Sequence, residues 1–338
     1  MPAPQWDLLT NYESFELIKR DYSIRHGRTP NNRHALEIAA PFTHARSYFR
    51  AAQAAESTVK PLLLYYGVVS LSRGLTLMLS RGLREAALTP SHGLSVKNWG
   101  SELCKDSPDF AALRVEVNAA GSFLELAQAT GFKSLLRSNS STVNYPYTHP
   151  PVGAGAMFSL GDVVSRLPAL QDHCSRWRDA ICCAPFKFEK IDDQEVHVRL
   201  QKPQWSWATS LAPDTWLFGT AFRFEAETSE QVVFTGPDDT EKGLGVTDYV
   251  DPTIFGIGDL WMTAPYPSGP TISKISTLFL LSYMLGMLVR YYPMQWTALI
   301  RSQIADAALP TLAAAVEAIE QEFPRLVLDF LAVPPSAP

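Results

Sequence analysis

The sequence predicts an α+β protein with a mainly helical core and a small, mostly antiparallel sheet in the middle of the chain. Helix-length apolar patterns fill both ends of the chain, and short runs that alternate apolar with polar residues lie between them. With 338 residues, 46% hydrophobic and 19% charged, the chain can bury a sizeable core. We expect an N-terminal helical segment over residues 1–90, a sheet-containing region over 91–270, and a C-terminal helical segment over 271–338 that packs on the first.

The N-terminal segment is expected to form a buried helical hairpin. A first helix ends at Gly27, a residue suited to the left-handed conformation that follows a helix. Because a proline ring clashes with the carbonyl one turn back, Pro41 is expected to separate a short helix from a longer one over about residues 42–56. The next helix, over residues 60–79, is apolar nearly all round and must be covered on most sides. We expect these last two helices to pack antiparallel.

The middle region has frequent Pro, Gly, Ser and Asn between short alternating runs. Alternation with β-branched and aromatic residues predicts strands. The runs begin at four positions: Leu113, Glu195, Trp216 and Gln231. One helix is expected from residue 160 to about 178, unless Pro168 breaks it, and residues 251–270 are expected to form an irregular connection over the core.

The C-terminal segment returns to helical patterns. Ser273 is expected to cap a helix that Pro293 ends, after which the chain continues as a helix in a new direction. Pro310 suits the first turn of an alanine-rich helix that ends near Phe323.

The sequence also argues against several protein classes. The N-terminus lacks the basic start and apolar run of a secretory signal, and the apolar segment 275–289 is shorter than the roughly 20 residues of a membrane-spanning helix. We therefore expect a cytoplasmic protein without a membrane partner. The four cysteines show no CxxC pair or zinc-ligand spacing, so we expect neither disulfides nor a metal site. Because no phosphate loop, dinucleotide fingerprint or nucleophile elbow is present, we expect no cofactor.

Short motifs spread over the chain carry a family resemblance. They lie in five segments: residues 45–52, residues 60–67 with 70–73, residues 92–94, residues 121–123 and residues 283–296. Together these segments resemble the YaaC-like family of bacterial proteins, and the likeness covers nearly the whole chain. The resemblance implies a shared fold and adds little chemistry.

The predicted hairpin is also similar to the HEPN domains, many of which are metal-independent ribonucleases in toxins and phage defence. Those enzymes use an arginine followed four to six residues later by a histidine, and Arg20 with His26 and Arg28 with His34 both match that spacing. The resemblance implies that His34 or His26 accepts the 2′-hydroxyl proton while Arg28 stabilises the charge on the phosphorane. A solvated basic turn, or anion binding without catalysis, accounts for the same residues.

Two groups of residues are candidates for binding. Residues 1–100 carry 12 Lys and Arg against 7 Asp and Glu, whereas the remainder carries 17 against 27, so the basic end is the better anion-binding candidate. Its candidate side chains are Arg20, Arg25 and Arg33. The second group is Arg290, Tyr291 and Trp296, which either end an apolar helix and fix the following bend, or line a pocket for a phosphate or a nucleobase.

We therefore expect a non-catalytic binding or regulatory subunit that acts through a protein partner, with bacterial stress or phage defence as its setting. Tryptophans of the middle region are candidate interface anchors, although core packing explains most of them equally well: Trp205, Trp207, Trp216 and Trp261. A nucleic-acid partner at the basic N-terminal segment and a homo-oligomer are further options. The alternative is a HEPN-like metal-independent ribonuclease, so the sequence leaves open whether the protein is an enzyme.

Overall fold

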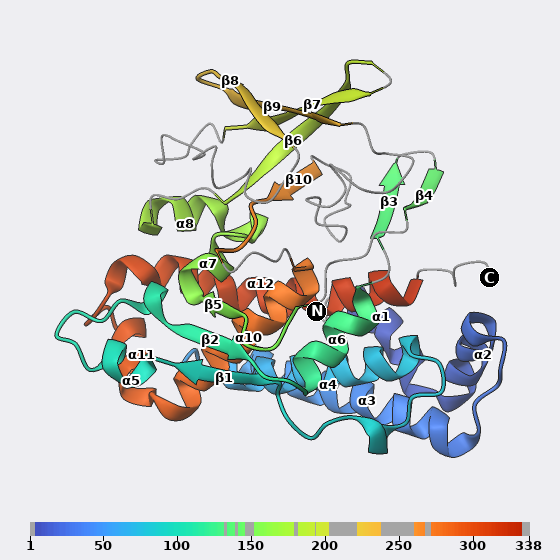
Figure 1. Ribbon diagram of the computed structural model, residues 1–338. Coiled ribbons are helices and arrows are strands. Elements are labelled where there is room, and N and C mark those ends of the chain that lie inside the picture. Colours follow the sequence, from blue (N-terminus) through green and yellow to red (C-terminus); the bar gives the residue numbers. More distant parts are fainter. Residues whose placement is uncertain are drawn as a thin grey trace.

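The computed structural model describes residues 4–131, 134–138, 141–145, 152–178, 182–192, 194–202, 222–237, 260–267 and 272–332. Figure 1 shows its elements. The α-helices are α1 (Pro4–Leu9), α2 (Phe15–His26), α3 (Asn32–Ala54), α4 (Lys60–Leu79), α5 (Trp99–Leu103), α6 (Ser122–Thr130), α7 (Leu160–Val164), α8 (Gln171–Arg178), α10 (Lys274–Tyr291), α11 (Pro293–Ile300) and α12 (Leu309–Ala332). The strands are β1 (Leu94–Lys97), β2 (Arg114–Val117), β3 (Ser134–Ser138), β4 (Ser141–Tyr145), β5 (Met157–Ser159), β6 (Cys183–Lys190), β7 (Glu195–Gln201), β8 (Arg223–Glu227), β9 (Gln231–Pro237) and β10 (Leu260–Thr263).

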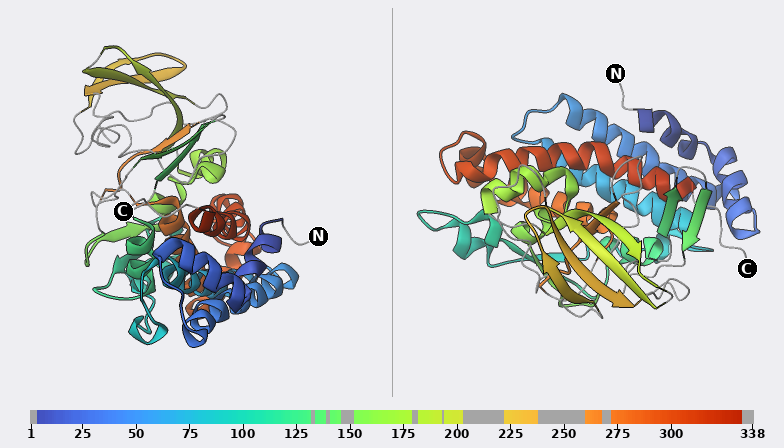
Figure 2. Two further views of the ribbon diagram at one scale, coloured as in Figure 1. Left: turned by 90° about the vertical axis from the view of Figure 1, so that its right-hand side faces the viewer. Right: turned by 90° about the horizontal axis from the view of Figure 1, so that it is seen from above.

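Helices from both ends of the chain form one core, as the sequence predicts. Helix α4 packs against α3 from its own end of the chain and against α10 and α12 from the other end (Figures 1 and 2). Glycines allow the closest approaches. A Cβ atom on Gly74 would lie 2.8 Å from the ring of Phe42 on α3, and one on Gly286 would lie 2.8 Å from the Cβ of Tyr65. The mainly helical α+β class is therefore confirmed.

In the two terminal helical segments, two boundaries that the sequence predicts at or near prolines differ from the structure. The expected break at Pro41 is wrong, because α3 runs unbroken from Asn32 to Ala54, and the expected end at Phe323 is wrong, because α12 continues through Pro324 to Ala332. Both prolines are buried. An internal proline costs about 3 kcal/mol, which burial of the apolar residues on either side of it can offset.

A three-stranded antiparallel sheet in the order β1-β2-β5 completes the helical body. Its inward side chains belong to the same hydrophobic cluster as the helices. They are Leu94, Val115, Val117 and Phe158. The helix expected over residues 160–178 is broken: Ser159 caps α7, and a 3-10 turn at Pro168–Leu170 precedes α8. The middle region thus contributes to the core as well as to the outer sheet.

A second antiparallel sheet, in the order β10-β6-β7-β9-β8, stands away from the helical body (Figures 1 and 2). Side chains of β7 alternate between half-buried and buried along the strand, which confirms the strand predicted from Glu195. The expectation of an irregular connection over residues 251–270 is wrong for Leu260–Thr263, which pair as β10 with Cys183–Phe186. Of the predicted run over residues 216–224, residues 216–221 lie outside the described residues, and its last two residues begin β8. Strands β3 and β4 form a separate hairpin.

Arg166 joins the chain near β10 to the helical body. Its side chain is 3% exposed, and it donates hydrogen bonds to the carbonyls of Ala264 (2.8 Å) and Pro265 (2.6 Å). Its guanidinium lies 4.4 Å from the ring centroid of Tyr266. These contacts fix where the segment after β10 enters the core.

Two parts of the described chain pass a length-and-composition test for membrane spans. One is α4, and the other is the pair α10 and α11 taken together, although a 106° bend separates them. In the fold, 61% of the apolar window of α4 is buried, and every residue of α10 from Lys274 to Val289 is buried. The core helices of globular proteins pass the same test, and α4 and α10 are buried to the extent expected of core helices.

Candidate functional site

The N-terminal arginines do not form a continuous cationic patch. Arg20 pairs with Asp21 at 3.0 Å and Arg33 pairs with Glu37 at 3.4 Å. Arg28 is exposed and makes no ion pair with the described part of the chain. This segment therefore presents little uncompensated positive charge that could bind the phosphates of a nucleic acid.

Arg25 points toward the C-terminal helix. Its Nη2 donates a 2.7 Å hydrogen bond to the carbonyl of Leu331 on α12, and its Nε and Nη1 are buried without a hydrogen-bond partner in the described residues. Burial lowers the pKa of the Arg25 guanidinium from its ordinary value. This side chain therefore links α2 to α12 rather than facing an external ligand.

The two candidate histidines lie against the protein rather than open to a substrate. The Nε2 atom of His26 is 2.9 Å from the carbonyl oxygen of Met78, and its ring lies 4.2 Å from that of Tyr22. His34 is 6% exposed, and its Nε2 is buried with no hydrogen-bond partner among the described residues. A general base must reach the proton that it removes, so this geometry does not favour the ribonuclease alternative.

His34 should make the stability of the protein depend on pH. Burial, and then the positive charge of Arg84, lower its pKa below the ordinary value of 6.5. The unfolded chain therefore takes up a proton first, and the free energy of unfolding should fall as the pH drops through 6.5 toward the lower folded-state value. Urea unfolding at about pH 7 and pH 5 measures this effect. Between pH 7 and pH 5, the free energy of unfolding should fall less for His34→Leu than for the unchanged protein. Equal falls would contradict the lowered pKa of His34.

The C-terminal candidates have two different roles. Trp296 is 3% exposed, and its Nε1 donates a 3.0 Å hydrogen bond to the carbonyl of Ser57, so it fastens α11 to the start of α4. Arg290 and Tyr291 are on the surface, and Tyr291 is 59% exposed. Only the last two can meet a partner directly.

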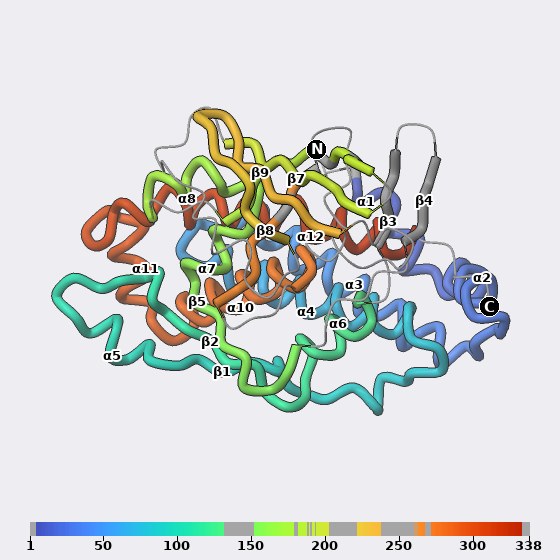
Figure 3. Tube along the Cα trace, turned by 45° about the horizontal axis from the view of Figure 1, so that its top comes forward, coloured from blue at the N-terminus to red at the C-terminus, as the bar shows by residue number. Residues whose placement is uncertain are grey.

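The N-terminal and C-terminal candidates do not form one site. His26 contacts the carbonyl of Met78 at the end of α4, whereas Trp296 contacts Ser57 just before its beginning. Because α4 has 20 residues, the two contacts lie about 30 Å apart along it. Figure 3 shows α2 and α11 at opposite ends of the helical body.

A third group, of which the sequence indicated only Arg290 as a candidate site residue, gathers where α4, α10 and the turn before β1 meet. We name it the His92–Arg290 cluster; it consists of Tyr65, Tyr66, His92, Tyr283 and Arg290. The Tyr65 hydroxyl is hydrogen-bonded to Nδ1 of His92, and both rings pack against Tyr283, with centroids 5.7 and 5.9 Å away. Arg290 Nη1 donates a 3.1 Å hydrogen bond to the Tyr66 hydroxyl. Residues far apart in the chain are thus brought to one place.

The protonation state of this cluster follows from burial. Burial raises the pKa of the Tyr65 phenol, and burial followed by the charge of Arg290 lowers the pKa of His92. Near neutral pH the phenol keeps its proton and the imidazole is neutral. The buried Tyr65 hydroxyl has no other described acceptor, so it donates to Nδ1, and the remaining proton of His92 sits on Nε2. His92 is only half-buried, and Nε2 makes no hydrogen bond with the described residues, so water can reach it.

Backbone contacts hold His92 in position. Its carbonyl accepts a 3.1 Å hydrogen bond from the N–H of Phe123 at the start of α6. The carbonyl of Leu94, two residues on, accepts a 3.1 Å hydrogen bond from the Tyr283 hydroxyl. Gly93 and Gly121 touch each other beside the turn, and both have positive φ angles (78° and 133°). The turn that carries His92 is therefore clamped between α6 and α10.

Each segment of the family motif meets another in the structure. Tyr48 stacks on Tyr66 with ring centroids 5.6 Å apart, which joins the segments on α3 and α4. The cluster joins the segments on α4, β1 and α10, and the Gly93–Gly121 contact adds the segment on α6. No curated protein and no solved structure matches the chain. A family model, described as YaaC-like protein, matches residues 9–331, so the chain belongs to the YaaC-like family.

Proposed function

We propose that the protein is a non-catalytic binding subunit that recognises an acidic surface of a partner protein. The contact surface is the corner between α10 and α11 with the neighbouring face of α3 and α4. We name it the corner surface and define it by Tyr48, Tyr66, Arg290, Tyr291 and Met294. The proposal rests on one observation: Arg290 presents its charge on an exposed aromatic surface without an ion-pair partner in the described residues.

Exposure supports a macromolecular partner. Tyr291 is 59% exposed, Met294 71% and Tyr48 36%, although each has a large apolar surface that water solvates poorly. Tyr, Met and Arg are the side chains enriched at the centres of protein interfaces, where aromatic and arginine anchors supply most of the affinity. A partner that covers these residues would bury apolar area and pair its own carboxylates with Arg290.

The geometry of Arg290 suits recognition of a carboxylate. Its Nη1 is held by Tyr66, and its guanidinium lies 5.0 Å from the ring centroid of Tyr291. These contacts limit the conformations of a side chain that is otherwise flexible, so less entropy is lost on binding. The regulatory role, and its setting in stress or phage defence, would follow from the identity of the partner.

Site-specific photocrosslinking in the native host tests this proposal. A photoreactive phenylalanine analogue at position 291 should give one discrete crosslinked protein. The matched control places it at Ile24 on α2, which is 66% exposed and lies at the other end of the helical body. Arg290→Glu should abolish the crosslink from position 291, and exchange of an acidic residue of the identified partner for lysine should restore it.

Three outcomes would overturn the proposal. They are equal crosslinking from positions 291 and 24, crosslinking from 291 that Arg290→Glu leaves unchanged, and crosslinking to RNA or to a second copy of this chain. Arg290→Glu should itself leave the free energy of unfolding within about 0.5 kcal/mol, as is usual for an exposed side chain, so misfolding would not explain the loss.

A further inference from the structure

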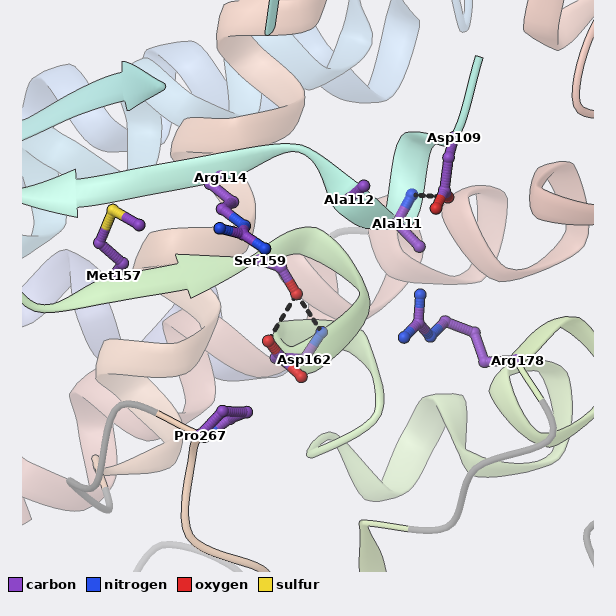
Figure 4. A pocket seen from close by; sticks show the side chains of 9 residues that line it. All are labelled: Asp109, Ala111, Ala112, Arg114, Met157, Ser159, Asp162, Arg178 and Pro267. Carbon is purple, nitrogen blue, oxygen red and sulfur yellow. Dashed lines mark hydrogen bonds between the residues drawn. The ribbon is translucent and has the colours of Figure 1, made fainter. Parts of the chain in front are cut away.

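A separate cavity lies between the three-stranded sheet and helices α7 and α8 (Figure 4). Its volume is about 480 Å³, within the range of small-molecule sites. Among its lining residues are Arg114 from β2, Ser159 from β5, Asp162 from α7 and Arg178 from α8. None of the residues of the corner surface lines it, so the two surfaces can be tested independently.

Two guanidinium groups face this cavity, and neither forms an ion pair with a carboxylate of the described residues. Figure 4 shows Arg178 on one side of it and Arg114 on the other, with Ser159 and Asp162 beside Arg114. Both arginines are exposed, and neither makes an ion pair or a side-chain hydrogen bond with the described residues. Most other arginines of the described chain do make such contacts, as at Arg84 with Glu37 and Arg199 with Glu189. Two unpaired guanidinium groups at one cavity suit an oxyanion with two charges.

The backbone around the cavity makes room for Arg178. Gly161 lies directly under its guanidinium, because a Cβ atom at position 161 would be 2.5 Å from Arg178 Nη1 and 2.6 Å from its Cζ. Any side chain at position 161 would displace the guanidinium. The glycine therefore allows the charge to lie flat against the first turn of α7.

Arg114 is held from both sides at the start of β2. Its backbone N–H donates a 3.1 Å hydrogen bond to Oδ1 of Asn98, and its carbonyl accepts a 2.8 Å hydrogen bond from Nε1 of Trp99. Trp99 is 1% exposed, so this anchor belongs to the core. The position of the Arg114 backbone is consequently fixed before any ligand arrives.

The carboxylate beside Arg114 is already compensated. Oδ2 of Asp162 accepts a 2.5 Å hydrogen bond from the Ser159 hydroxyl, and Oδ1 lies 3.7 Å from Nη1 of the buried Arg166. Asp109, at the other edge of the cavity, accepts a 2.9 Å hydrogen bond from the N–H of Ala111. Asp162 therefore takes its counter-charge from Arg166 and leaves the charges of Arg114 and Arg178 to a ligand, while both carboxylates can still accept hydrogen bonds from ligand hydroxyls.

We infer that this cavity binds a small sugar phosphate. A phosphate monoester carries about −1.5 to −2 charges at neutral pH, which matches Arg114 and Arg178. The sugar hydroxyls would donate to Asp162 and Asp109, and the carbon skeleton would pack on Met157 and Pro267. The described residues of the lining include no aromatic ring, so they offer no stacking platform for a nucleobase.

Calorimetric titration of the full chain tests this inference, with ribose 5-phosphate as the probe. Saturable binding at one site is expected, and Arg114→Ala or Arg178→Ala should each weaken it at least about tenfold, since each variant removes charge-assisted hydrogen bonds to the phosphate. Arg178→Lys should recover part of the loss. Arg20→Ala makes the same change in net charge at a 66% exposed side chain outside the cavity and should leave binding unchanged.

Parallel titrations with inorganic phosphate, succinate and adenosine monophosphate decide the ligand class. The inference requires ribose 5-phosphate to bind more tightly than all three. Equally tight binding of inorganic phosphate would show an adventitious ion only. Tighter binding of succinate would identify the ligand as a carboxylate, and tighter binding of adenosine monophosphate would indicate a site for a nucleobase. Each of these results would overturn the inference. Absence of saturable binding, or affinity unchanged in both arginine variants, would also overturn it, and thermal unfolding of the variants checks that they are folded.

Discussion

Glu322→Gln is expected to destabilise the protein by about 3 kcal/mol, because it removes the only described counter-ion of a buried ammonium group. Lys274 is the first residue of α10, is 5% exposed, and has its Nζ atom 2.6 Å from Oε2 of Glu322 on α12. The positive end of the helix dipole disfavours a cation at that position. The carboxylate therefore offsets both the burial of the ammonium group and its repulsion by the dipole. The expected value is at the lower end for a buried pair because the Glu322 side chain is 19% exposed. Denaturant unfolding measures it.

The two partners of this pair should differ in their effects. Lys274→Met should cost less than Glu322→Gln, because it leaves a carboxylate that keeps some contact with water, and the double variant Lys274→Met with Glu322→Leu should regain most of the loss. Glu317→Gln is the matched control on the exposed face of α12 and should change stability by no more than about 0.5 kcal/mol. A Glu322→Gln variant as stable as this control would show that the ion pair is not buried as described.

Gly121→Ala is expected to cost about 4 kcal/mol, the combined effect of backbone strain of about 1–3 kcal/mol and overpacking of about 1–3 kcal/mol. Gly121 has φ 133° and ψ 177°, a conformation essentially confined to glycine. An added Cβ would also lie 2.3 Å from the backbone nitrogen of Gly93 and 2.9 Å from the carbonyl oxygen of Ser91. These contacts are with backbone, which cannot rotate away as a side chain can.

The effect of Gly121→Ala should extend to His92, because Gly93 follows it directly. NMR of the imidazole should therefore show changed chemical shifts for His92 in any Gly121→Ala protein that folds. Gly100→Ala is the control: outside its own helix, no atom of the described residues lies within 4 Å of the added Cβ, and alanine is favoured over glycine in a helix by up to about 1 kcal/mol. Equal stabilities of the two variants would contradict the close contact between the turns.

The architecture was largely predictable because it depends on patterns that are local in the chain. Gly27 ends α2 with φ 66°, Ser273 caps α10, and Pro293 begins α11, each for the reason expected from its own chemistry. Pro41 shows where local reasoning fails. Its ring disfavours a helix within a few residues of its own position. The contacts that keep α3 intact are made with α4, and no local pattern in the sequence predicts where α4 will lie.

The candidate site was less predictable, because its residues meet only after the chain has folded. Tyr65 lies in a nearly continuous apolar run, which indicates a core position, and that is where it lies. Nothing near it in the sequence indicates that His92 or Tyr283 will contact its ring. The available signal was indirect: Tyr65, His92 and Arg290 each belong to a different segment of the family resemblance. The turn at Pro168 brings Arg178 close to Gly161. From the sequence, the chain at this proline could either bend or continue as one helix.

Helices from the two ends of the chain pack directly against each other and so assemble the His92–Arg290 cluster. An NMR sample labelled at glycine and tyrosine tests this packing at the crossing of α4 and α10, where Gly286 lies against the Cβ of Tyr65. We expect a strong nuclear Overhauser effect between the α protons of Gly286 and the β protons of Tyr65, and Tyr65→Ala, which removes the labelled tyrosine, should remove this signal. This packing would be contradicted if both resonances were assigned in the unchanged protein and no such effect were observed between them.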